Sequence, residues 1–145
     1  MAENQRRGFV GMAPQPPVQP SRILVVEDNR EAADMFVMML QTCGYEAQAA
    51  YSGQTALEMA VPYPPDIVLL DIGLPGMDGY EVARHLRQHP QTKEVWVIAM
   101  TGYGQAAACQ CTQEAGFDYH LVKPVDMRQL RALLATLAKK PRSAT

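Results

Sequence analysis

The sequence predicts a single domain of the α/β class, in which helices cover both faces of a parallel β-sheet. The 145 residues, 48% of them hydrophobic, are enough to fill one core and too few for two domains. The runs Ile23–Val26 and Ile67–Leu70 are wholly apolar, which is typical of strands buried on both faces. Stretches with helical spacing alternate with the strands, and this alternation indicates crossover connections between parallel strands.

Two strand–helix pairs make up the first half of the predicted domain. After the strand at 23–26, Asp28 or Asn29 can cap a helix that ends at Gly44. Residues 45–50 form a weaker strand, and Ser52 begins a short helix that a run of prolines interrupts. The apolar positions at helical spacing are Met35, Phe36, Met39, Leu40 and Cys43 in the first helix and Ala56, Leu57, Met59 and Ala60 in the second.

The second half continues the alternation. Its predicted elements are a strand at 67–70, a helix at 80–88, a strand at 95–100, a helix at 105–115, a strand at 119–122 and a helix at 126–139. Gly116 ends the fourth helix, and Asp126 caps the fifth. The chain therefore has five strands and five helices.

The ends of the chain differ from this core. Residues 1–20 are rich in proline and glutamine, so we expect a flexible tail or linker there, with a docking peptide as the weaker alternative. We expect the domain to span 21–140 and a short flexible tail to occupy 141–145.

Composition excludes several classes of protein. A net charge of −2 argues against strong binding to nucleic acid. No apolar run reaches the length of about 18 residues that spans a bilayer, and no signal peptide is visible. Cys43, Cys109 and Cys111 are too few for a disulfide framework, so we expect buried or half-buried reduced thiols and a cytoplasmic location.

Reactive side chains follow four of the five strands. Glu27 and Asp28 follow the first strand, Asp71 the third, Thr101 the fourth and Lys123 the fifth. The carboxyl ends of parallel strands meet at one edge of the sheet, so these groups should converge there. Three converging carboxylates require cations nearby, and their oxygens suit Mg²⁺.

This combination of groups suits phosphoryl transfer. A carboxylate can act as the nucleophile, with a metal ion, an ammonium and a hydroxyl on the phosphoryl oxygens. Asp71 is the best-placed nucleophile, whereas Glu27 and Asp28 are better placed to hold metal. Taken singly, Asp28 could be only a helix cap, Thr101 only a turn residue and Lys123 only a surface lysine.

These segments resemble the receiver domain of two-component response regulators. The resemblance is carried by Ile23–Asn29, Ile67–Gly79, Met100–Gly102 and Val122–Pro124, and it covers roughly residues 21–140. It implies a flavodoxin-like, doubly wound (βα)5 fold with strand order 2-1-3-4-5. It also implies a signalling domain rather than an enzyme with a separate substrate.

The resemblance assigns a role to each group. Asp71 corresponds to the aspartate that accepts a phosphoryl group from a histidine kinase's phosphohistidine. Glu27, Asp28 and Asp71, with the backbone carbonyl of Gly73, correspond to the Mg²⁺ ligands.

The remaining implied roles concern switching. Thr101 and Lys123 correspond to the pair that moves onto the phosphoryl oxygens, and the peptide bond from Lys123 to Pro124 is expected to be cis. A downstream protein would bind the face formed by the fourth helix, fifth strand and fifth helix. His120 stands where the family often has a tyrosine or phenylalanine that swings inward. We expect it to act as a flat, partly buried ring, with a pH-sensitive switch as the sharper alternative.

Other readings remain open. The domain could be a stand-alone regulator or a module of a hybrid histidine kinase. It could be a degenerate receiver that serves only as a docking module, although the intact Asp71, Thr101 and Lys123 argue against this. A phosphatase with an aspartyl-phosphate intermediate would have a second acid two residues after Asp71, where this chain has Gly73.

Overall fold

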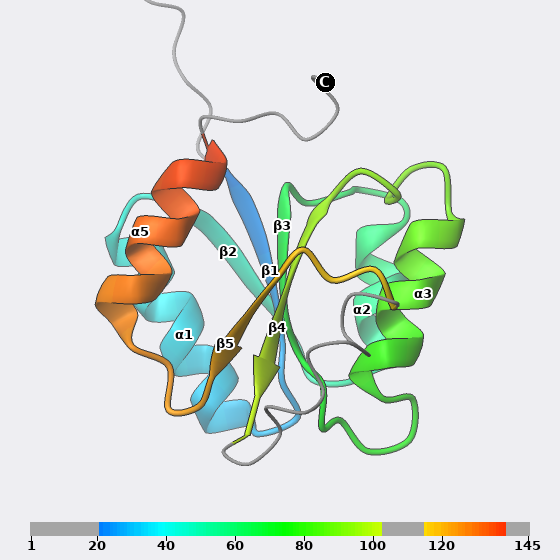
Figure 1. Cartoon of the computed structure of the whole chain (residues 1–145), viewed down its shortest axis with the longest axis horizontal. Helices are drawn as coiled ribbons and strands as arrows, with labels where there is room; N and C mark the ends of the chain where they lie inside the picture. The colour runs from blue at the N-terminus through cyan, green and yellow to red at the C-terminus, as the bar shows by residue number, and fades with distance from the viewer. Residues whose placement is uncertain (1–20, 103–114, 139–145) are drawn as a thin grey trace, which may run out of the picture.

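A computed structural model shows the predicted parallel sheet with helices on both faces (Figure 1). The structure describes residues 21–102 and 115–138. The elements are β1 (Arg22–Val26), α1 (Arg30–Thr42), β2 (Glu46–Ala50), α2 (Gly53–Ala60), β3 (Ile67–Asp71), α3 (Gly79–Gln88), β4 (Trp96–Thr101), β5 (Tyr119–Val122) and α5 (Met127–Ala138). The helix expected at 105–115 lies outside the described residues except for its last residue, Ala115.

The strand order is β2-β1-β3-β4-β5, and every neighbouring pair is parallel. This confirms the expected order. Helices α1 and α5 cover one face of the sheet, and α2 and α3 cover the other (Figure 1). Because β3 lies between β1 and β4, the residue at its carboxyl end stands at the centre of the rim.

The core follows the two-residue period of the strands. In β1, Ile23 and Val25 pack into the core under α1 and α5, whereas Leu24 and Val26 pack into the core under α2 and α3. All five residues of β3 are buried, as an apolar run in a parallel sheet predicts.

Polar side chains cap the helices on one edge of the sheet. Asn29 accepts a hydrogen bond from the N–H of Ala32 at the start of α1, and Ser52 does the same for α2. Asp78 and Glu81 form a reciprocal capping box at the start of α3. These caps fix the point at which each loop leaves the rim, so they also position the side chains there.

An arginine network ties the elements together at the opposite edge. The guanidinium of Arg87, from the end of α3, donates to the carbonyls of Gly116, Lys93 and Val95 at 2.9, 2.9 and 2.7 Å. It also pairs with the carboxylate of Asp118 at 2.8 Å. α3 is thereby bound to the segments that lead into β4 and β5.

Two apolar side chains of the first helical segment are exposed, and for Cys43 this makes the expected burial wrong. Cys43 is exposed, because it is the residue that caps the end of α1 and its side chain lies outside the packed face. Met35 in α1 is 61% exposed, although it shares the helical spacing of the apolar positions. The helix buries only part of its apolar surface against the sheet. No helix in the described parts of the chain combines the length and the hydropathy that crossing a membrane requires.

Candidate functional site

Acidic side chains meet at the carboxyl edge of the sheet, as expected. Glu27 and Asp28 directly follow β1, and Asp71 is the last residue of β3. One carboxylate oxygen from each of the three lies within 4.8 Å of the others. The neighbouring pairing of β1 and β3, with Val26 opposite Leu70, brings them together.

The three carboxylates differ in exposure. Glu27 is 3% exposed and Asp71 is 8% exposed, whereas Asp28 is open to solvent. Burial favours the neutral form of a carboxyl group, and a second negative charge nearby favours it too. Such a cluster is therefore costly unless positive charge lies close to it.

Lys123 supplies one such charge. Its ammonium nitrogen lies 2.8 Å from Oε1 of Glu27 and 3.2 Å from Oδ2 of Asp71. Burial by itself lowers the pKa of Lys123, but the hydrogen bond to Glu27 and the charges of both carboxylates outweigh this and raise it. Lys123 is thus held as a cation between two acids. The Lys123–Pro124 peptide bond is cis.

The pKa of Glu27 is raised. Desolvation by burial is the main cause, and the negative charge of Asp71 adds to it. The hydrogen bonds from Lys123 and from the N–H of Asn29 act in the opposite direction without outweighing burial. One lysine shared between two buried acids therefore leaves Glu27 short of positive charge.

This donor set fits a hard divalent cation. Carboxylate oxygens are the ligands that Mg²⁺ and Ca²⁺ prefer, and Mg²⁺ is usually held by one or two carboxylates with water completing its shell. A cation here would offset the burial cost that raises the pKa of Glu27. Glu27, Asp28 and Asp71 are the residues that can hold it.

Backbone contacts fix the carboxylate of Asp71. Its Oδ1 accepts a hydrogen bond of 2.9 Å from the N–H of Gly73. The backbone of Asp71 and Ile72 is also in close contact with Gly79, the first residue of α3. A Cβ at Gly79 would lie 2.5 Å from Cα of Ile72 and 2.7 Å from the carbonyl oxygen of Asp71. Only glycine fits there without displacing the end of β3.

Gly79 is a residue that sequence reasoning missed. The capping pattern of Asp78 and Glu81 marks a helix start, but it does not show which backbone the helix approaches. The role predicted for Gly73 concerned its carbonyl, whereas the contact with Asp71 is made by its N–H. The carbonyl's role as a ligand stays a prediction.

Thr101 and His120 lie on β4 and β5, the two strands that follow β3 in the sheet. Thr101 is buried at the end of β4, and its hydroxyl donates to the carbonyl of Leu121 at 3.4 Å. His120 in β5 is exposed, so the expectation of a partly buried ring is wrong. Alternation along β5 buries Leu121 and turns its neighbours outward.

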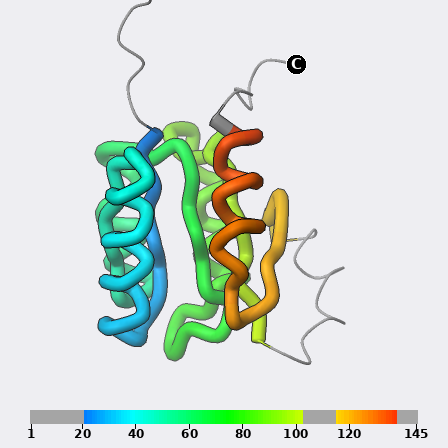
Figure 2. Tube along the Cα trace, turned by 90° about the vertical axis from the view of Figure 1, so that its left-hand side faces the viewer, coloured from blue at the N-terminus to red at the C-terminus, as the bar shows by residue number. Residues whose placement is uncertain are grey.

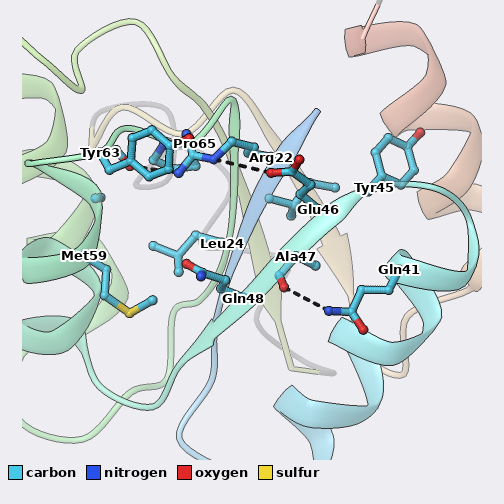
Figure 3. A pocket seen from close by; sticks show the side chains of 12 residues that line it. Arg22, Leu24, Gln41, Tyr45, Glu46, Ala47, Gln48, Met59, Tyr63 and Pro65 are labelled. Carbon is cyan, nitrogen blue, oxygen red and sulfur yellow. Dashed lines mark hydrogen bonds and ion pairs between the residues drawn. The ribbon is translucent and has the colours of Figure 1, made fainter. Parts of the chain in front are cut away.

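A hollow of about 380 Å³ lies at the other end of the sheet (Figure 3). Arg22 and Glu46, the first residues of β1 and β2, line it, together with Tyr63 and Met59. The guanidinium of Arg22 stacks 3.5 Å from the ring centre of Tyr63. This hollow is separate from the acidic cluster, which follows the last residues of the strands.

Comparison with known proteins agrees with the site. Residues 23–135 match the family model described as "Response regulator receiver domain". The chain is 32% identical over 127 residues to "DNA-binding dual master transcriptional regulator RpaA" of Synechocystis, covering 85% of this chain and 53% of that protein. It therefore spans about half the length of this curated relative.

Solved structures show the same fold. A response regulator from Chloroflexus aurantiacus matches with a TM-score of 0.79 and 33% identity, covering 84% of this chain and all of that one. The receiver domain of sensor histidine kinase PA1611 from Pseudomonas aeruginosa, with a magnesium ion in its active-site cleft, matches with a TM-score of 0.76 and 28% identity over 83% and 99% of the two chains. With its strand order, its acidic rim and its family match, this chain belongs to the response regulator receiver domain family.

Proposed function

We propose that Asp71 accepts a phosphoryl group from the phosphohistidine of a histidine kinase and that the modified domain then regulates a protein partner. The observation that carries this proposal is the placement of Asp71. It stands at the centre of the rim, within 4.8 Å of two further carboxylates and 3.2 Å from the ammonium of Lys123. The domain acts as a regulatory phosphoacceptor.

In the transfer, a carboxylate oxygen of Asp71 attacks the phosphorus atom. The phosphorus–nitrogen bond to the donor histidine breaks, and its electron pair stays on the imidazole. Glu27, Asp28 and Asp71 would hold Mg²⁺, with the carbonyl of Gly73 as a further ligand. When bound, this ion supplies positive charge for the oxygens of the phosphoryl group.

Lys123 is already aligned for this reaction. Its ammonium lies between Glu27 and Asp71, so it can follow the new negative charge by a short movement toward the phosphoryl oxygens. Breaking the contact with Glu27 removes a hydrogen bond that stabilises its carboxylate, and a cation bound by Glu27 would offset this loss.

Thr101 supports a two-state switch. Its hydroxyl is bound to the carbonyl of Leu121, so it must leave that acceptor to donate to a phosphoryl oxygen on Asp71. Such a movement would loosen the contact between β4 and β5 and so alter the surface that includes His120. We propose that partner binding reads this surface, together with the fourth and fifth helices.

We also propose that residues 21–140 form the receiver, with 1–20 as a linker and 141–145 as a tail. The family match over 23–135 supports these limits. The linker is compatible with either a stand-alone regulator or a module of a hybrid kinase.

Incubation with a small phosphodonor and Mg²⁺, followed by intact mass spectrometry, tests the proposal. The wild-type chain should gain one phosphoryl group, and Asp71→Asn should gain none. Asp34→Asn, which changes an exposed acid on α1, is the matched control and should react like the wild type. Labelling that persists in Asp71→Asn would reject Asp71 as the acceptor.

A further inference from the structure

Charge is distributed unevenly along this chain. Residues 127–145 contain five cations, Arg128, Arg131, Lys139, Lys140 and Arg142, and no acid. The first 126 residues hold the other eight cations and all 15 acids. A local block of one sign in a chain of the opposite sign is typical of a segment that binds opposite charge.

The first two of these cations line a hollow. Arg128 and Arg131 are three residues apart on α5, so both guanidinium groups lie on one side of the helix. Helices α1 and α5 lie side by side on this face of the molecule (Figure 2). A hollow of about 410 Å³ lies between α5 and the segment that follows the end of α1, and it is lined by Cys43, Tyr45, Arg128, Arg131, Ala132 and Ala135. No carboxylate lines it within the parts of the chain that the structure describes.

These arginines differ from the cations that pair with carboxylates in the fold. Lys123 pairs with Glu27 and Asp71, and Arg87 pairs with Asp118. Neither Arg128 nor Arg131 forms an ion pair with a carboxylate among residues 21–102 and 115–138.

Asp126, the acid that directly precedes α5, is bound to the backbone of the helix. The carboxylate of Asp126 accepts the backbone N–H of Arg128 at 2.9 Å and so caps the helix. The ring of Tyr45 points toward α5 (Figure 3). Burial and the nearby Cys43 raise the pKa of Tyr45, and the positive charge of Arg131 lowers it by a smaller amount. The hollow therefore combines two unpaired guanidinium groups with a half-buried phenol.

We propose that this hollow binds an acidic segment of a partner protein. Guanidinium groups match carboxylates as bidentate donors, and the alanines leave space for the segment to approach the helix. Two neighbouring guanidinium groups match more than one carboxylate, so a run of acidic residues suits them better than a single small anion. A nucleic acid or a membrane would place an extended negative surface against a chain whose first 126 residues carry the excess of acids.

The test uses the full chain and a fluorescent oligoglutamate peptide at low ionic strength. Binding is measured by anisotropy for the wild type and for Arg128→Gln/Arg131→Gln. The double substitution should weaken binding about three- to tenfold, since each exposed ion pair contributes modestly. Arg84→Gln/Lys93→Gln removes two exposed cations elsewhere and should leave the affinity unchanged.

Cys43 gives a second readout that locates the peptide. It is exposed and lines the hollow, so a bound peptide should slow its alkylation, measured by mass spectrometry of the proteolytic fragment that contains it. Equal weakening by the two double variants, or an unchanged alkylation rate at saturating peptide, would overturn the proposal. Tighter binding of an oligonucleotide or of phosphatidylglycerol vesicles through the same arginines would overturn the choice of partner.

Discussion

The arginine network at the amino edge of the sheet makes a demanding test of the packing. Replacing Arg87 by methionine keeps most of the side-chain volume but removes every hydrogen bond that its guanidinium donates. Asp118, whose side chain is 11% exposed, then loses its ion-pair partner and keeps the N–H of Val97 as a donor. The carbonyls of Gly116 and Val95 lose the guanidinium as well.

The expected cost follows from this geometry. Breaking a buried ion pair by removing one partner costs about 3–5 kcal/mol, because the remaining charge stays buried. The side chains of Arg87 and Asp118 are 17% and 11% exposed, which places the pair close to that regime. A domain of this size has a free energy of unfolding of about 5–15 kcal/mol, so Arg87→Met should remove a large share of it. The melting temperature should fall by about 10 °C or more.

Urea unfolding followed by circular dichroism measures this loss. Asp118→Asn in the Arg87→Met background should recover part of it, because the unpaired charge disappears. Glu46→Gln is the control, since Glu46 is 4.0 Å from Arg22 and largely exposed, and it should cost less than about 1 kcal/mol. A loss below about 1 kcal/mol for Arg87→Met would show that the network does not carry the stability assigned to it.

Three further predictions concern the acidic rim. Gly79→Ala should lower the free energy of unfolding by about 1–3 kcal/mol, because its Cβ would lie 2.5 Å from backbone. Gly73→Ala is the control. Its Cβ would meet only a side-chain oxygen at 3.5 Å, so it should be nearly neutral in the same urea titration. At a hundredfold excess over its Kd, Mg²⁺ should stabilise the wild type by about 2.7 kcal/mol and so raise its melting temperature. Chelation should reverse this rise. A similar rise in Asp28→Asn would exclude that carboxylate as a ligand. Since the pKa of Glu27 is raised on folding, its contribution to stability is fully present below the unfolded value of 4.5 and is lost as the pH rises through the folded value. Glu27→Gln should therefore stabilise the metal-free domain at pH 7 and lose this advantage below pH 4.5; an advantage that does not change with pH would contradict the burial argument.

Local sequence signals located most elements because their causes are local. The apolar run at 67–70 corresponds to β3, and Asn29 and Ser52 cap α1 and α2 as their residue types suggest. The gathering of Glu27 and Asp71 at one rim could also be predicted, since parallel strands end on the same side.

Other features depend on which segments become neighbours. Cys43 is exposed, contrary to the burial expected of a free cysteine, because residue type does not reveal how much of a helix the sheet covers. His120 was expected to be partly buried, but β5 turns it outward. The close approach of Gly79 to the backbone of Asp71 has no local signal at all, because it joins α3 to the end of β3.

The sequence by itself determined that buried parallel strands would end in acids, a hydroxyl and an amine, because strand length and periodicity are local properties of the chain. Only the tertiary structure decided that Lys123 lies between Glu27 and Asp71 while the hydroxyl of Thr101 faces Leu121. Those contacts depend on strand order and register, which arise when distant segments pack, and no pattern within one segment specifies them.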